Sequence, residues 1–312
     1  MLSLEKQQIG LMKIMKQQMN VLDDLQYRLE HTRPFTKPLV NDQSYGFNGN
    51  LANEILDHWK TKYNWRKREK FLNKYPQFIT SVQGLKIHFL HVKNQNLPQH
   101  IRVLPLLILH GWPGSVREFY EIIPLLTNPR KDRDFVFEVI VPHLPGYAFS
   151  DAASIPGLGV AQIGVILKNL MNRLGFQKFY LQGGDLGALV NHAIAANFED
   201  SVLGLHLNMC VSIHPYSLMK LILGAFYPSW IKNEQHRNFL YPLSNFLSFI
   251  IEESGYLHLQ ATKPDSLDGG LKRKFKYDDL LDNIMLYWIN KSATTAFRLY
   301  AETFNRRGAQ LW

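Results

Sequence analysis

The sequence of 312 residues predicts an α/β fold, a mostly parallel sheet with helices on both faces, flanked by helical regions. Two observations predict it. From Thr80 the apolar residues change from a helical spacing to alternation, and strand-like runs then alternate with helix-like runs up to about residue 210. Strands that alternate with helices indicate a parallel sheet with helices packed against it. Beyond that point no convincing strand follows.

The N-terminal region, 1–79, is predicted to be a helical meander. Residues 1–30 have apolar side chains three and four positions apart, as one face of a helix requires, at Leu11, Ile14, Met15, Met19, Leu22, Leu25 and Leu29. Two more helical stretches are expected at 51–63 and 66–74. Pro76 ends the last of these, because proline cannot continue a helix.

The α/β core is expected over 80–210. A hairpin around Gly84 opens it, since apolar and polar residues alternate on both sides of that glycine. Strands are then predicted at 103–109, 135–141, 178–182 and 202–207, and helices at 116–126, 160–174 and 187–198. Segment 211–304 carries aromatic and apolar residues at helical spacing, which predicts a helical lid over the sheet.

Composition excludes several classes of protein. A hydrophobic content of 46% is enough for a large core, and the single cysteine, Cys210, rules out an internal disulfide framework. The net charge of +9 is spread along the chain without a nucleic-acid-binding motif, so no nucleic-acid partner is expected. No apolar run approaches the roughly 18 residues of a membrane span, and residues 1–20 lack the features of a signal peptide.

The candidate nucleophile is Asp185, in the run Gly183-Gly184-Asp185-Leu186-Gly187-Ala188. A strand leads into this run and a helix leaves it, which is the setting of a nucleophile elbow with Asp where hydrolases usually have Ser. A carboxylate there can form an ester with its substrate, and the ester must then be hydrolysed. The competing interpretation is that Asp185 only caps the helix. If Asp185 is the elbow residue, a serine esterase is excluded.

A second motif, His110-Gly111-Trp112-Pro113-Gly114-Ser115, follows the strand at 103–109. In an elbow hydrolase this loop supplies one backbone N–H of the oxyanion hole, and the residue after the nucleophile supplies the other. The candidates are the N–H groups of Trp112 and Leu186. Ser115 and Glu118 have the spacing of a capping box for the next helix. The His110 side chain is interpreted as structural, with no part in proton transfer.

Together these motifs resemble the epoxide hydrolases of the microsomal type, and within them the juvenile hormone epoxide hydrolases of insects. The resemblance covers about residues 25–304. It rests on the two motifs above and on further matches that include Thr32-Arg33-Pro34-Phe35, Trp65-Arg66, Pro76-Gln77-Phe78, Gly84-Leu85-Lys86-Ile87-His88-Phe89, Pro145-Gly146-Tyr147 and Gly204-Leu205-His206-Leu207-Asn208.

The resemblance implies an α/β-hydrolase fold and a mechanism. Asp185 would be alkylated by a lipophilic epoxide, either juvenile-hormone-like or xenobiotic, and two lid tyrosines, Tyr256 and Tyr300, would give protons to the epoxide oxygen. Water is the second substrate, and neither a metal nor an organic cofactor is implied. The family also suggests the endoplasmic reticulum or microsomal membrane. Because no membrane anchor is visible, peripheral membrane association and a cytoplasmic location both stay open.

Three departures from the family pattern qualify these expectations. Leu186 replaces the usual Trp, and only Ser266 and Leu267 separate two lid motifs that normally lie further apart, which indicates a partly deleted lid. The family's general-base histidine and charge-relay acid fall beyond Trp312, so neither is identified in this chain, and the sheet is expected to be incomplete at its C-terminal end. The tail, 305–312, resembles nothing in the family.

The missing base leaves three functions to weigh. An epoxide hydrolase that stalls at the Asp185 ester is the leading expectation, since water would lack an activating group. A non-catalytic homologue that binds an apolar ligand is the alternative from a different class. A haloalkane dehalogenase also uses an elbow Asp, but it typically needs indole N–H donors for the halide, and Leu186 removes one of them.

Overall fold

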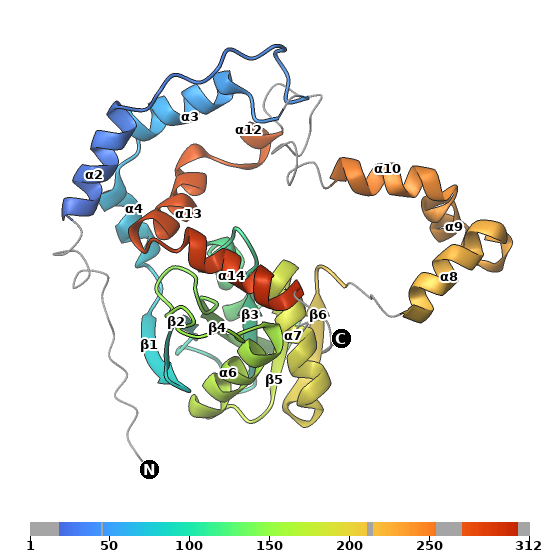
Figure 1. Ribbon diagram of the computed structural model, residues 1–312. Coiled ribbons are helices and arrows are strands. Elements are labelled where there is room, and N and C mark those ends of the chain that lie inside the picture. Colours follow the sequence, from blue (N-terminus) through green and yellow to red (C-terminus); the bar gives the residue numbers. More distant parts are fainter. Residues whose placement is uncertain (1–18, 45, 211–214, 254–269, 305–312) are drawn as a thin grey trace. The chain divides into compact units, whose positions relative to one another are not determined.

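The computed structural model describes residues 19–44, 46–210, 215–253 and 270–304 (Figure 1). The chain forms two compact units. One comprises Asn64–Cys210 and Asp282–Trp312, together with Met1–Leu22, and the other comprises Asp23–Tyr63 and Val211–Leu281. The units divide at residue 210, where the expected core ends, but at residue 63 and not at 79, and the last part of the expected lid, from Asp282 onward, belongs with the sheet.

The first unit contains a six-stranded sheet in the order β1-β2-β4-β3-β5-β6. Its strands are β1 (Gln77–Val82), β2 (Leu85–Val92), β3 (Arg102–Leu109), β4 (Phe135–Pro142), β5 (Phe179–Gly183) and β6 (Val202–Leu207). The first hairpin and the β2–β4 pair are antiparallel, and the remaining pairs are parallel. The α/β fold and every predicted strand are thereby confirmed.

The N-terminal helical region ends earlier than the predicted boundary at residue 79. Gln77 and Phe78 already pair with Leu90 and Phe89 of β2, so β1 begins directly after Pro76. The predicted helix over 116–126 is also in two parts, the 3-10 helix η1 (Val116–Phe119) and α5 (Ile123–Thr127). Pro124 lies in the first turn of α5, where a proline starts a helix rather than continuing one.

One layer of helices packs on the sheet through a single apolar core. It consists of α6 (Val160–Arg173) and α7 (Asp185–Asn197), which lie against each other (Figure 1). Leu167 and Leu170 of α6 and Val190 and Ile194 of α7 are fully buried. Gly164 permits this contact, because a Cβ at that position would lie 3.2 Å from the Ile194 side chain. The layer fixes α7, and with it the residue at its first position.

Strand β6 is one edge of the described sheet. Leu203 and Leu205 are 46% and 41% exposed there. An open edge with apolar side chains is prone to pair with other chains. The same strand carries His206 and ends just before Asn208, whose N–H donates to the Gly183 carbonyl at 3.0 Å.

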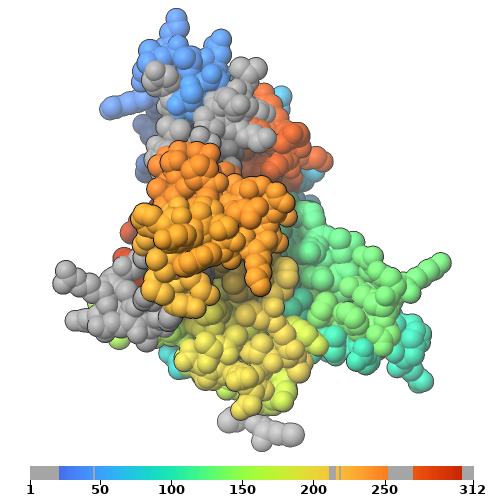
Figure 2. Space-filling model, turned by 90° about the vertical axis from the view of Figure 1, so that its right-hand side faces the viewer, coloured from blue at the N-terminus to red at the C-terminus, as the bar shows by residue number. Residues whose placement is uncertain are grey.

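The other unit is helical over its described residues. It contains α3 (Gly49–Thr61), α8 (Pro215–Phe226), η3 (Pro228–Trp230), α9 (Glu234–Leu240), α10 (Leu243–Glu253), α12 (Leu271–Lys274) and most of α2 (Met19–Glu30). A hydrogen bond of 2.7 Å joins His58 to Asp278, and an ion pair of 2.7 Å joins Glu54 to Lys272. Helices α8 to α10 expose several large apolar side chains, and Figure 2 shows part of this segment in orange on the surface. No helix of the described residues is long and apolar enough to cross a membrane.

Helices α4 (Trp65–Leu72), α13 (Tyr277–Ile289) and α14 (Ala293–Phe304) and the 3-10 helix η2 (Glu199–Ser201) complete the elements of the described residues. Sequence analysis places α13 and α14 in the lid, but from Asp282 onward they belong to the unit that holds the sheet. The physical reason is burial. Asp282 is fully buried and bonds Arg68 of α4 at 2.8 and 2.5 Å and Arg117 of η1 at 3.3 Å. These two arginines therefore hold α13 against the sheet unit.

Candidate active site

The centre of the site is the turn between β5 and α7. Strand β5 ends at Gly183 and α7 begins at Asp185, as the elbow interpretation predicts. Asp185 has a φ of +48°, a left-handed conformation that is uncommon for a residue with a side chain and that costs about 1–3 kcal/mol. The N-cap of α7 is Gly184, and no side chain caps the helix. Asp185 therefore does not cap α7, and its carboxylate bonds a group outside the helix.

Two glycines make this tight turn possible. A Cβ on Gly187 would meet the Leu109 carbonyl oxygen at 2.4 Å, and a Cβ on Gly183 would meet backbone atoms of Gly187 at 2.8 Å. A side chain at Gly187 would push the turn away from the end of β3, and one at Gly183 would push the first turn of α7 away from the end of β5. The Gly-x-Asp-x-Gly spacing thus has a packing reason in addition to its place in the motif.

The partner of Asp185 is the loop that follows β3. The backbone N–H of Trp112 donates to Asp185 Oδ1 at 2.8 Å. Gly111 makes this approach possible, since a Cβ there would lie 2.4 Å from both Cβ and Oδ1 of Asp185. Leu186, the second predicted donor residue, follows Asp185 directly and has a buried side chain. The structure therefore brings the predicted nucleophile and one predicted oxyanion donor into contact.

The loop ends in the predicted capping box, which the structure confirms. Ser115 accepts the Arg117 N–H at 3.2 Å, and the Glu118 carboxylate accepts the Ser115 N–H at 3.1 Å. Glu118 has a further property that sequence analysis missed. Although its side chain keeps contact with solvent, surrounding protein raises the pKa of its carboxyl to about 7, and the negative charge of Asp185 adds to the rise. The Glu118 carboxyl is therefore close enough to Asp185 for the charge of Asp185 to raise its pKa.

His110 is held in one tautomer by two backbone groups. It is buried, its Nδ1–H donates to the Gly111 carbonyl at 2.9 Å, and its Nε2 accepts the Leu144 N–H at 3.1 Å. Burial lowers the pKa of His110 to about 4, so the ring is neutral at pH 7. Both ring nitrogens are occupied, which leaves neither free to accept a proton from water.

Two more buried histidines lie behind His110. His143 contacts the ring of His110 at 5.7 Å between centroids, and its Nδ1 lies 2.9 Å from Nδ1 of His88. Nε2 of His88 is 2.9 Å from Oε1 of Gln77, an acceptor, so His88 donates there and His143 donates to His88. Burial lowers the pKa of His88 to about 3 and that of His143 well below its ordinary value. The cluster is neutral and structural.

Of the two predicted tyrosine donors, one lies beside the loop 110–115, which we call the oxyanion loop after its predicted role. Tyr300 on α14 meets the Trp112 ring edge-on, with the centroids 5.8 Å apart. Tyr256 lies outside the described residues. The structure therefore groups Asp185, Trp112 and Tyr300, although these residues are far apart in sequence.

Asn283 and Tyr287 on α13, which belong to neither predicted motif, also contact this loop. The Asn283 side-chain amide donates to the Pro113 carbonyl, and the Tyr287 hydroxyl donates to the Gly114 carbonyl at 2.9 Å. Burial, and then the neighbouring charges of Glu118, Tyr300 and Asp185, raise the pKa of Tyr287 well above its ordinary value. The available signal was the spacing of these two residues, four positions apart, which puts them on one face of a helix.

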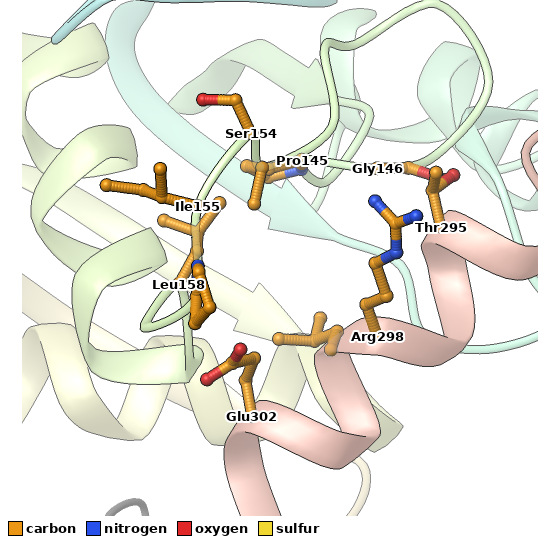
Figure 3. A pocket seen from close by; sticks show the side chains of 11 residues that line it. Pro145, Gly146, Ser154, Ile155, Leu158, Thr295, Arg298 and Glu302 are labelled. Carbon is orange, nitrogen blue, oxygen red and sulfur yellow. The ribbon is translucent and has the colours of Figure 1, made fainter.

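A cavity of about 330 Å³ lies next to α14 but does not include Asp185 among its lining residues (Figure 3). Its charged residues are Arg298 and Glu302, which extend from α14 toward the loop that carries Ser154 and Leu158. Arg298 and Tyr300 are two positions apart and therefore lie on roughly opposite sides of the helix. The cavity is accordingly separate from the group around Asp185. Among the described residues, no cluster of His, Cys, Asp and Glu could hold a metal ion.

The sequence matches two protein-family models. A model described as "Epoxide hydrolase N terminus" matches residues 12–119, and a model described as "alpha/beta hydrolase fold" matches residues 105–292. The second match alone spans more than half of the chain.

Named relatives agree with these models. Juvenile hormone epoxide hydrolase 2 of Ctenocephalides felis is 44% identical over an alignment of 317 positions. The aligned part covers 91% of this chain and 68% of the relative. Epoxide hydrolase 1 of Oryctolagus cuniculus is 39% identical over 91% of this chain and 70% of its own length. The crystal structure of juvenile hormone epoxide hydrolase from the silkworm Bombyx mori superposes with a TM-score of 0.87 at 43% identity, covering 94% of this chain and 76% of the silkworm protein.

Proposed function

The chain belongs to the epoxide hydrolases of the α/β-hydrolase fold, and from this premise we propose that Asp185 attacks a lipophilic epoxide and forms an alkyl ester that water converts to a diol. The observation that carries the proposal is the Trp112 N–H bonded to Asp185 Oδ1 at the strained turn. A carboxylate oxygen held by a backbone donor is already placed where negative charge develops in ester hydrolysis.

We assign different roles in this reaction to the two oxygens of Asp185. Oδ1 accepts the Trp112 N–H, which leaves Oδ2 to form the bond to an epoxide carbon. As that bond forms, the carbon–oxygen bond of the epoxide breaks and its oxygen takes a proton from a tyrosine. Among the described residues, Tyr300 is the candidate for this proton donor, since its ring packs against Trp112. Tyr256 is the second tyrosine to which the family pattern gives this role. The product of this step is an ester of Asp185 with a free hydroxyl group.

In the second step water adds to the ester carbonyl, the bond from the carbonyl carbon to the alkyl oxygen breaks, and the diol leaves. One proton of the water goes to the alkyl oxygen of the diol and the other returns to the tyrosinate, so Asp185 is again a carboxylate. Negative charge then develops on the oxygen held by Trp112, and the N–H of Leu186, at the start of α7, is the proposed second donor. Among the described residues, no histidine forms a hydrogen bond or an ion pair with Asp185. His110 is neutral and fully bonded. We therefore expect ester hydrolysis to be slower than ester formation in this chain.

Substrate class and location complete the proposal. The relatives are named for juvenile hormone and for epoxides in general, so a terpenoid or xenobiotic epoxide is the proposed substrate. Association with the endoplasmic reticulum membrane is proposed from the family alone.

The test is intact-protein mass spectrometry after incubation with styrene oxide. We expect a mass increase equal to one substrate molecule, located on the peptide that contains Asp185, and slow release of the diol. Asp185→Ala is expected to give neither adduct nor diol. Rapid diol release without an adduct would contradict the slow second step. Binding without an adduct in the unmodified chain would favour the non-catalytic alternative, and halide release from 1-chlorobutane would favour a dehalogenase.

A further inference from the structure

The oxyanion loop is held from outside by one face of α13. Asn283 and Tyr287 lie four positions apart on that helix and bond the carbonyls of two successive loop residues, Pro113 and Gly114. We propose that Tyr287, supported by Asn283, is a positioning residue that holds the Trp112 N–H on Asp185. This inference rests on the proposed function in one respect: that function makes the Trp112 N–H a donor to the oxygen that becomes negatively charged.

The loop has few other restraints on this side. From inside, His110 Nδ1–H and the Gly114 N–H both donate to the Gly111 carbonyl, at 2.9 and 3.0 Å. That carbonyl and the Trp112 N–H belong to the same peptide group, so fixing one fixes the direction of the other. The bond from Tyr287 secures Gly114, whose own N–H makes one of these two inner bonds. Tyr287 thereby reaches the Trp112 N–H through one short hydrogen-bonded turn.

Helix α13 is a rigid support for this task. Asp282, beside Asn283, is fully buried between Arg68 and Arg117. Met285 and Leu286 on the same helix are at most 2% exposed. A site is held accurately when its supporting residues stand on a packed element rather than on a loop. The ion pairs and the apolar side chains provide that packing.

The chemistry of the two side chains is better explained by a role in positioning the loop than by a contribution to the stability of the fold. The raised pKa of Tyr287 keeps its hydroxyl protonated, so it remains a donor to the Gly114 carbonyl. Asn283 donates through Nδ2, while its Oδ1 is buried without a hydrogen-bond partner among the described residues. An unpaired buried acceptor costs free energy. A polar residue at position 283 is therefore explained by its contact with the loop.

The test compares Tyr287→Phe with Tyr120→Phe. Each change removes one hydroxyl that donates to a backbone carbonyl, and the Tyr120 hydroxyl donates to Leu72 at 2.6 Å, away from the oxyanion loop. Two rates are measured, formation of the styrene oxide adduct and hydrogen exchange of the Trp112 amide in ¹⁵N-tryptophan-labelled protein. A hydrogen bond of ordinary strength corresponds to a change of about 2- to 12-fold. We expect Tyr287→Phe to slow adduct formation and to accelerate exchange by factors in this range.

We expect the control variant, Tyr120→Phe, to keep both rates close to those of the unmodified chain, even if the change lowers its thermal stability. The proposal is overturned if Tyr287→Phe and Tyr120→Phe behave alike in both measurements. If the unmodified chain forms no adduct, the proposed function fails by itself. Exchange at Trp112 then decides the positioning role, because this readout needs no reaction.

Discussion

Gly111→Ala is the most direct perturbation of the contact between loop and nucleophile. A Cβ at Gly111 would lie 2.4 Å from Cβ, 2.4 Å from Oδ1 and 2.7 Å from Cγ of Asp185. Gly111 does not have a positive φ, so alanine is compatible with the backbone there. The new methyl group therefore acts through its contact with Asp185 and not through backbone strain.

The size of the effect follows from these distances. Two carbon atoms in contact prefer a separation of about 3.5 Å or more, and the observed 2.4 Å falls short by about 1.1 Å (3.5 − 2.4). Either the loop or the Asp185 side chain must move by that amount, and the 2.8 Å bond from Trp112 is lost. A displacement of about 1 Å at a reacting group costs roughly 100-fold in rate. We therefore expect adduct formation on Asp185 to slow by about 100-fold.

The assay is the time course of the styrene oxide adduct, followed by mass spectrometry in single-turnover mixtures. Gly159→Ala is the matched control, because a Cβ there has its nearest neighbours at 3.4 Å and lies at the start of α6, away from Asp185. We expect the control to react at the rate of the unmodified chain. An adduct rate for Gly111→Ala within threefold of the control would refute the claim that this contact positions the nucleophile.

Two further predictions concern stability. Burial lowers the pKa of His110 to about 4 and that of His88 to about 3, so the unfolded chain takes up protons first as the pH falls below 6.5. We expect the free energy of unfolding, measured by urea titration, to fall by several kcal/mol between pH 6.5 and pH 4; a value at pH 5 equal to that at pH 7 would contradict this. Asp282→Ala removes the fully buried carboxylate that bonds both Arg68 and Arg117 and is expected to lower the free energy of unfolding by about 3–5 kcal/mol in urea titrations. Asp134→Ala, in an exposed pair, should barely change it.

The strands and the elbow could be predicted because their signals are local. Alternation around Gly84 and the apolar run before Asp185 each depend on neighbouring residues, and all of the predicted strands are present. The spacing of glycines at the elbow also has a local cause, since the turn itself excludes side chains. These features would be predicted in the same way from a fragment of the chain.

The extent of the lid could not be predicted, because it depends on packing between distant residues. Helical spacing assigns α13 to a helix correctly, but it does not show which surface the helix contacts. That is decided by Asp282, whose partners Arg68 and Arg117 lie more than 160 positions earlier. Read alone, an Asp on a helix is an ordinary surface residue. Only the folded structure shows that it is fully buried.

The same reasoning explains why the site was predicted in part. Asp185 and Trp112 belong to motifs whose positions on strand ends imply that they meet, since the carboxyl ends of adjacent parallel strands lie at one edge of the sheet. Tyr287 has no such constraint, because its bond to Gly114 joins residues 173 positions apart and needs only one hydroxyl and one carbonyl. The groups expected to react were thus found from local patterns. The residues that hold them in place come from helices whose packing is decided elsewhere in the chain, and these are the positions where substitution will reveal roles that motifs do not record.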